Sequence, residues 1–191
     1  MTSFSCDATV MFCDIRNFTM LFEKKDPIKA VSFANEVLAV MGKEVEKNDG
    51  VVDRFTGDGF LAHFGVESSG ANHADMACRA VLDLRSVLSQ INSNRYLKTE
   101  NVLNIGIGIH SGEVAVGEIT SGKITQKTIL GDTVNTASRI ETLTKFFSVD
   151  ALISKATRDH LTEDLKLHKM PLKKLKGIER DVQTFWLLPM N

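Results

Sequence analysis

The chain has 191 residues, of which 43% are apolar and 25% charged, and its formal net charge is −1. This composition is typical of one folded domain with a buried core, and the near-neutral charge argues against a bulk nucleic-acid or anionic-membrane partner. The three cysteines form no C-x-x-C pair and no run approaches the ~18 apolar residues of a spanning helix, which argues against a disulfide framework, a cysteine zinc site and membrane contact by this segment.

The first third of the chain predicts a strand, two helices and a hairpin. A nearly continuous apolar run predicts a strand buried on both faces, and it ends at Asp14. Asp26 and Pro27 are a typical helix start, and Asn48-Asp49-Gly50 ends that helix. Gly57-Asp58-Gly59 predicts the tight turn of a hairpin. The expected elements are a strand over 8–13, helices over 17–25 and 26–47, and strands over 51–56 and 60–64.

The rest of the chain predicts two further helices among several strands. Residues 105–109 alternate isoleucine with glycine, and glycine inside a strand often marks the close approach of another backbone or a ligand. Ser111-Gly112-Glu113 is expected to be a turn into a returning strand, and the polar residues 121–127 predict a protruding hairpin. The expected elements are helices over 71–91 and 133–144 and strands over 103–109, 114–119, 151–153, 166–170 and 182–187.

The mixture of hairpins and helices indicates the fold class. It argues against an all-parallel, doubly wound sheet and favours an α+β fold of the ferredoxin-like, split βαβ kind. We therefore expect a mainly antiparallel sheet with helices on one face. The sequence has no repeat or linker, so a single domain over 1–191 is expected, with its motif-bearing core at about 8–188. Because the chain opens almost directly on a strand, we also expect this domain to have been cut from a longer protein.

Two aspartates lie where a side chain can point into a cleft. Asp14 ends a buried strand, and Asp58 lies at the tip of the hairpin. Two carboxylates held close together raise each other's pKa unless a cation lies between them, and oxygen-only ligation favours magnesium or manganese over zinc. On the residues alone another interpretation stays open: Asp14 caps the short helix and Asp58 satisfies its own turn. The five histidines are scattered without a metal-binding spacing, so no metal role is expected for them.

Four segments in order resemble the catalytic domain of class III adenylyl and guanylyl cyclases, over about 8–187. Phe12-Cys13-Asp14-Ile15-Arg16-Asn17-Phe18-Thr19 resembles the first metal motif of the family. Residues 53–59, Asp-Arg-Phe-Thr-Gly-Asp-Gly, with 62–65 after them, resemble the second. Residues 131–139, Gly-Asp-Thr-Val-Asn-Thr-Ala-Ser-Arg, resemble the helix of the transition-state residues, and 174–177 resemble the phosphate-lysine region. The resemblance implies that the ribose 3′-oxygen of a nucleoside triphosphate attacks the α-phosphorus and that pyrophosphate leaves.

The resemblance also implies a role for individual residues. Two divalent metal ions, Mg²⁺ or Mn²⁺, would be bound by Asp14, Asp58 and the backbone carbonyl of Ile15. The β- and γ-phosphates would be bound by backbone amides of Asn17, Phe18 and Thr19 at a helix start. The terminal phosphates would be bound by Lys176. Lys174 lies only two positions away in the sequence, so the resemblance could also assign this role to Lys174.

Asn135 and Arg139 complete the catalytic set that the resemblance implies. Asn135 would orient the ribose, and Arg139 would stabilise negative charge at the transferring phosphorus. Four residues apart on a helix, they share one face, which from spacing alone could also be ordinary solvated surface. In the family each site is shared between two subunits, so the resemblance implies a homodimer with two equivalent sites.

Two further residues bear on which base is bound. Adenylyl cyclases of the family usually have Lys at the position of Arg54 and Asp or Thr at the position of Thr128, whereas guanylyl cyclases usually have Glu and a small residue such as Cys. Thr128 fits the adenine type, whereas Arg54 fits neither, and its forked donor suits the paired acceptors of guanine. The missing carboxylate favours ATP, which predicts an adenylyl cyclase. Arg54 could instead be an ion-pair partner of Asp53 or Asp58.

Two alternatives remain open at this stage, a guanylyl cyclase and a non-catalytic cyclase homology domain that only dimerises or binds nucleotide. The presence of both metal aspartates, Asn135 and Arg139 argues against the second alternative. A cytoplasmic location is expected, either free or as the cytoplasmic domain of a membrane-anchored or sensor protein. A regulatory domain is expected upstream.

Overall fold

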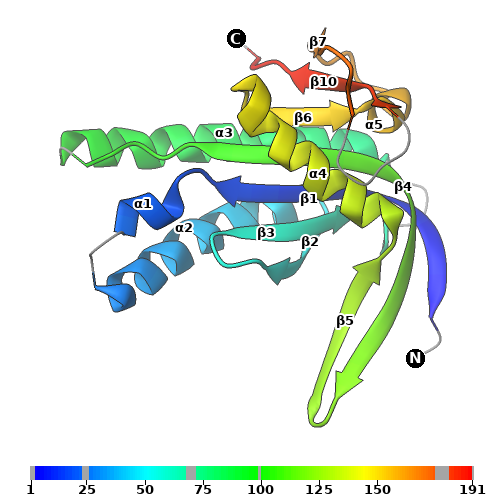
Figure 1. Cartoon of the computed structure of the whole chain (residues 1–191), viewed down its shortest axis with the longest axis horizontal. Helices are drawn as coiled ribbons and strands as arrows, with labels where there is room; N and C mark the ends of the chain where they lie inside the picture. The colour runs from blue at the N-terminus through cyan, green and yellow to red at the C-terminus, as the bar shows by residue number, and fades with distance from the viewer. Residues whose placement is uncertain (1–2, 23–25, 68–71, 99, 175–180, 191) are drawn as a thin grey trace.

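The computed structural model describes residues 3–22, 26–67, 72–98, 100–174 and 181–190, and a mainly antiparallel sheet runs through it (Figure 1). Its helices are α1 (Phe18–Phe22), α2 (Pro27–Lys47), α3 (His73–Leu97), α4 (Asp132–Phe147) and α5 (Lys155–Asp159). Its strands are β1 (Phe4–Ile15), β2 (Gly50–Phe55), β3 (Gly59–Phe64), β4 (Ile105–Ser121), β5 (Ile124–Leu130), β6 (Ala151–Ser154), β7 (Leu167–Lys169), β8 (Lys173–Lys174), β9 (Asp181–Val182) and β10 (Thr184–Leu187).

The strand order confirms the expected fold class. The large sheet runs β2-β3-β1-β4-β6-β10-β7, with β5 paired to β4, while β8 and β9 form a small separate sheet. The pair β4–β6 is parallel, and the other pairs of the large sheet are antiparallel. The central strand β1 therefore lies between β3 and β4, with both of its faces covered by other elements.

Helices cover both faces of the sheet, so the expectation of helices on one face is wrong. The odd-numbered side chains Met11 and Cys13 of β1 pack in one core with residues of α2 and α3. The even-numbered Ala8 and Val10 pack in a second core with residues of α4. Successive side chains of a strand point to opposite faces, so α2 and α3 lie on one side and α4 on the other.

Glycine in β4 allows α4 to lie directly on the sheet. A Cβ atom built on Gly108 would lie 2.5 Å from the carbonyl oxygen of Ala137 and 2.6 Å from the Cα of Glu141. No larger residue fits without moving α4, because both neighbours are helix backbone. Gly108 therefore marks the close approach of another backbone, which is one of the two possibilities that the sequence left open.

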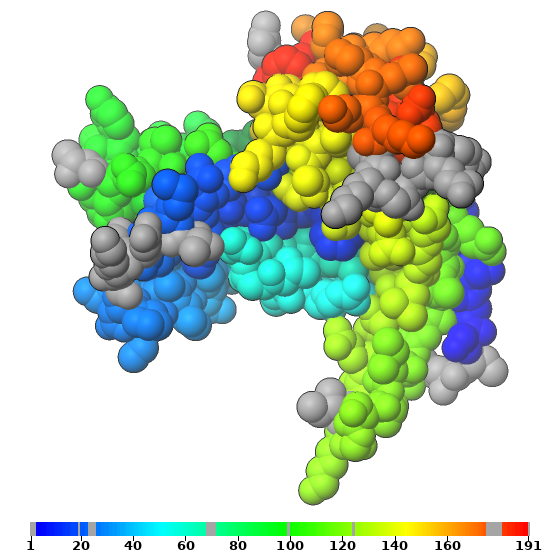
Figure 2. All heavy atoms as spheres, viewed as in Figure 1, coloured from blue at the N-terminus to red at the C-terminus, as the bar shows by residue number. Residues whose placement is uncertain are grey.

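The turn expected at Ser111-Gly112-Glu113 is wrong, because β4 continues through these residues. Its ladder with β1 is unbroken from Ile15–Ile105 to Phe4–Val116. Ser111 is buried there, and its hydroxyl lies 2.7 Å from that of Thr9. The chain reverses instead near Gly122, where φ is +61°. The β4–β5 hairpin projects away from the rest of the molecule (Figures 1 and 2), which agrees with the hairpin predicted over 121–127.

None of the helices in the described part of the chain combines the length and the apolar character required to cross a membrane. Cys6, Cys13 and Cys78 are free thiols, and burial raises the pKa of Cys13 and Cys78.

Candidate active site

The structure brings Asp14 and Asp58 together at one edge of the central strand. Asp14 lies opposite Gly59 in the β1–β3 ladder, and the Ile15 N–H donates to the Asp58 carbonyl oxygen at 3.0 Å. A Cβ atom on Gly59 would run into the Cys13 carbonyl oxygen and lie 3.1 Å from the Asp14 Cα. Glycine at this position therefore lets the hairpin close against β1 and places the Asp58 carboxyl beside that of Asp14.

The electrostatics of this edge favour a bound cation. Burial, the charges of Asp58 and Glu141, and a hydrogen bond to Asp58 together raise the pKa of Asp14 to about 6, although the charge of Arg16 lowers it. Burial also raises the pKa of Glu141. Arg16 lowers the pKa of both Asp14 and Glu141, but burial and repulsion between carboxyls outweigh its effect. A divalent ion between Asp14 and Asp58 would relieve this repulsion, and the oxygen-only donor set fits Mg²⁺ or Mn²⁺.

Sequence reasoning missed the ion pair of Arg16 with Glu141. Arg16 Nη2 lies 3.0 Å from Glu141 Oε1, and it donates to the Thr144 hydroxyl and, at 3.4 Å, to the Glu141 carbonyl oxygen. A Cβ atom on Gly106 would overlap the Arg16 guanidinium and lie 2.6 Å from Glu141 Oε1. The glycine at 106 was the available signal for this pair, which connects the metal-motif strand to α4.

The segment after β1 turns sharply into α1. Asn17 has a φ of +57°, and its carbonyl oxygen accepts the Leu21 N–H at 3.1 Å. The Phe18 ring packs against Phe22 and Phe33, with centroids 5.0 Å and 6.3 Å away. The backbone at the start of α1 thus follows directly on the aspartate edge. The side chain of Thr19 and all of Lys176 lie outside the described residues, whereas Lys174, in β8, is exposed.

Asn135 and Arg139 do not meet the aspartates within one chain. Ala137 and Glu141 occupy the side of α4 that packs on the sheet, with Gly108 against both. Asn135 is exposed and Arg139 partly exposed. Residues 135 and 139 are about half a helical turn from 137 and 141, so their side chains leave the helix on the side away from Asp14.

Asp53 holds the two residues predicted to bind the base. Its side chain is 2% exposed, and one carboxylate oxygen accepts from Arg54 Nη1 and from the Thr128 hydroxyl, each at 2.9 Å. Its other oxygen accepts the Ile129 N–H at 3.1 Å. Arg54 Nη1 also lies 2.5 Å from Thr128 Oγ1. The structure thus brings Arg54 and Thr128 together and makes Arg54 a partner of Asp53, which the sequence left open.

The chain resembles known proteins both in sequence and in fold. Residues 3–189 match the family described as the adenylate and guanylate cyclase catalytic domain. An adenylate cyclase of Anabaena cylindrica is 34% identical over 158 residues, which are 81% of this chain but only 30% of that protein. The adenylyl cyclase CyaB of P. aeruginosa superposes with a TM-score of 0.90 at 27% identity, covering 100% of this chain and 98% of that one. The guanylyl cyclase Cya2 gives a TM-score of 0.90 at 26% identity, covering 100% and 96%.

Proposed function

Because the chain belongs to the adenylate and guanylate cyclase catalytic domain family, we propose that it converts ATP into cyclic AMP and pyrophosphate. The observation that carries the proposal is the contact of the Asp14 and Asp58 carboxyls at the end of β1, where burial and mutual repulsion raise the pKa of Asp14 to about 6. Two carboxylates this close favour binding of a divalent cation, because the cation compensates their negative charge.

Asp14 and Asp58 would hold two divalent ions, Mg²⁺ or Mn²⁺, with the backbone carbonyl of Ile15 as a further ligand. Such ions, when bound, lower the pKa of the ribose 3′-hydroxyl and neutralise charge on the leaving pyrophosphate. The Arg16–Glu141 ion pair would fix the position of β1 relative to α4. Arg16 would also keep the site from becoming so negative that it repels a triphosphate.

The remaining catalytic residues would bind and orient the nucleotide. Backbone N–H groups of Asn17, Phe18 and Thr19 would bind the β- and γ-phosphates, since N–H groups at a helix start lack intrahelical partners. Asn135 would orient the ribose. The Arg139 guanidinium would stabilise charge at the α-phosphorus, an effect worth roughly 10³-fold or more in related phosphoryl transfers. Lys176, or Lys174 beside it, would bind the terminal phosphates.

We propose that two copies of the chain complete each site. Asn135 and Arg139 leave α4 on the side away from Asp14, so one chain offers the two halves of the site in different directions. A two-fold homodimer would bring the aspartates of one subunit to α4 of its partner and would create two equivalent sites.

The arrangement around Asp53 supports adenine. The Thr128 hydroxyl donates to Asp53, so its oxygen can accept from the adenine amino group, while Arg54 retains N–H groups for adenine N1. GTP is the second candidate, because a guanidinium fork also matches guanine O6 and N7, and Cya2, with the same fold, is a guanylyl cyclase.

The test is an assay of the purified chain with Mn²⁺ and either ATP or GTP, scoring the cyclic product. We expect cyclic AMP, and we expect Asp14→Ala and Asp58→Ala to abolish it, whereas the exposed Asp164→Ala should not. Full turnover in either aspartate variant would refute the metal assignment, and cyclic GMP as the main product would refute the base assignment. Mixing Asp58→Ala with Arg139→Ala chains should restore part of the activity, and a mixture without activity would contradict the shared site.

A further inference from the structure

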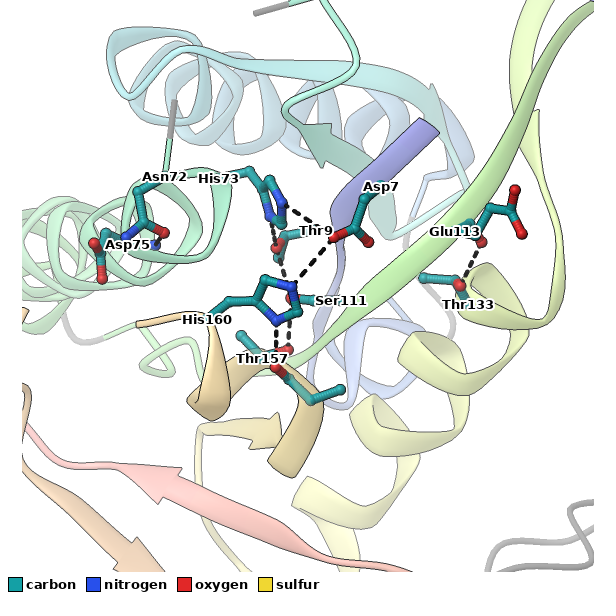
Figure 3. A network of polar contacts seen from close by, with 11 residues as sticks. Asp7, Thr9, Asn72, His73, Asp75, Ser111, Glu113, Thr133, Thr157 and His160 are labelled. Atoms are coloured by element: carbon teal, nitrogen blue, oxygen red, sulfur yellow. Dashed lines mark hydrogen bonds and ion pairs between the residues drawn. The ribbon is translucent and has the colours of Figure 1, made fainter. Parts of the chain in front are cut away.

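Three residues far apart in sequence meet at the other end of β1 (Figure 3). Asp7 lies in β1, His73 is the first residue of α3, and His160 follows α5. Their ligand atoms all lie within 4.8 Å of one another. Within the described ranges this is the only group of three or more His, Cys, Asp or Glu residues with that property. Asp7 is seven residues from Asp14, which in a strand corresponds to about 23 Å, so the cluster is separate from the candidate active site.

The spacing of these atoms matches the coordination sphere of a small ion. Asp7 Oδ2 lies 3.2 Å from His160 Nε2 and 3.8 Å from His73 Nε2. Ligands at about 2.0–2.1 Å from a tetrahedral zinc ion lie about 3.3–3.5 Å from one another. An ion could therefore bind between the three side chains with only small adjustments. The Asp7 and His160 side chains are 52% and 42% exposed, which leaves room for water as a fourth ligand.

In each imidazole a hydrogen bond made by Nδ1 leaves the lone pair of Nε2 directed towards the space between the three side chains. His160 Nδ1 lies 2.8 Å from the Ala156 carbonyl oxygen, which can only accept, so Nδ1 carries the proton. In the neutral ring, Nε2 then has a free lone pair facing Asp7. A backbone carbonyl that fixes the tautomer in this way is a usual partner of metal-binding histidine.

The same reasoning applies to His73 through a chain of hydroxyl groups. The Ser111 hydroxyl donates to Thr157 Oγ1 at 3.1 Å, so Ser111 must accept from the Thr9 hydroxyl, 2.7 Å away. Thr9 in turn must accept from His73 Nδ1, also at 2.7 Å. His73 is thus protonated on Nδ1, and its Nε2 lone pair faces Asp7.

We propose that Asp7, His73 and His160 form a binding site for one Zn²⁺ ion, distinct from the two-metal site at Asp14. Two imidazole nitrogens and one carboxylate are a zinc-type donor set, whereas Mg²⁺ prefers oxygen ligands throughout. The ion would tie β1 to the first turn of α3 and to the end of α5. This proposal departs from the expectation that the histidines have no metal role, which rested on their spacing: the three ligands are separated by 66 and 87 positions.

The test uses protein stripped of metal and carrying Asp14→Asn and Asp58→Asn, so that the other cation site does not contribute. We expect Co²⁺, as a spectroscopic substitute, to bind at one ion per chain with the strong visible absorption of four-coordinate cobalt, and Zn²⁺ to displace it. His160→Gln and Asp7→Asn should weaken Zn²⁺ binding by more than the roughly 10–100-fold that loss of an outer hydrogen-bond partner costs. The exposed His168→Gln is the control and should bind as the parent does.

Thermal unfolding gives a second readout that does not involve activity. Zn²⁺ at 100 times its Kd should favour the folded state by a factor of about 100, and this gain should disappear in His160→Gln. His160 lies on the surface, so this variant stays informative even where a change at the more buried His73 impairs folding. Absence of stoichiometric binding, or equal Zn²⁺ affinity in His160→Gln and the parent, would overturn the proposal and leave the contact of His160 Nε2 with Asp7 Oδ2 as the reason for the cluster.

Discussion

Gly108→Ala is expected to displace the helix that carries Asn135 and Arg139. The new Cβ atom would lie 2.5 Å from the Ala137 carbonyl oxygen, whereas ordinary contacts begin at 3.4 Å, so α4 must move by about 0.9 Å or more (3.4 minus 2.5). Overpacking against backbone costs about 1–3 kcal/mol of stability. A shift of about 1 Å in catalytic groups can cost on the order of 10²-fold in rate. We therefore expect a folded but weakened protein whose kcat falls roughly 100-fold.

The measurement is urea unfolding together with kcat for cyclic product formation with Mn²⁺. Gly42→Ala is the matched control, since its Cβ atom would meet only Val52 Cγ2, at an ordinary 3.6 Å, inside α2. That change should raise the free energy of unfolding by about 0.4–1 kcal/mol and leave kcat unchanged. Unchanged stability and unchanged kcat in Gly108→Ala would refute the argument that glycine sets the position of α4. Loss of stability alone would refute only the link to catalysis.

Two other predictions concern buried polar groups. Burial lowers the pKa of His110 from its ordinary 6.5 to about 4. Between these pH values the unfolded chain binds one more proton than the folded chain. The free energy of unfolding should therefore decrease as the pH is lowered from 6.5 to 4, by about 3 kcal/mol in all. In His110→Asn this pH-dependent loss should vanish. The free energies of unfolding of the two proteins are measured by urea unfolding from pH 7 to pH 4, and a constant difference between them would contradict the prediction. Asp53→Asn should release Arg54 towards the base and lower the ratio of kcat/KM for ATP to that for GTP about 10-fold, or about 1.4 kcal/mol. An unchanged ratio would show that Asp53 does not set base preference.

Local sequence signals predicted the aspartate edge because its geometry is local. A strand end and a glycine turn fix where Asp14 and Asp58 lie, and the ladder from Thr9–Phe64 to Asp14–Gly59 brings them together. The turn expected at Ser111-Gly112-Glu113 failed for the opposite reason. Turn residues are a weak local preference, and the long ladder with β1 overrides it. The position of α4 depended on Gly106 and Gly108, whose meaning appears only once the opposing helix is known.

The two proposed cation sites lie on opposite sides of β1 because successive side chains of a strand alternate between its two faces. Asp7 shares its side of β1 with Thr9, whose hydroxyl lies 2.7 Å from His73 at the start of α3. Asp14 lies seven positions on, an odd number, and therefore on the opposite side, where burial, Asp58 and then Glu141 of α4 raise its pKa. Sites this far apart with no common ligand are expected to contribute independently to stability. Coupling between a zinc ion at Asp7 and catalysis at Asp14 would thus require β1 itself to shift against β3 and β4, which their long ladders resist.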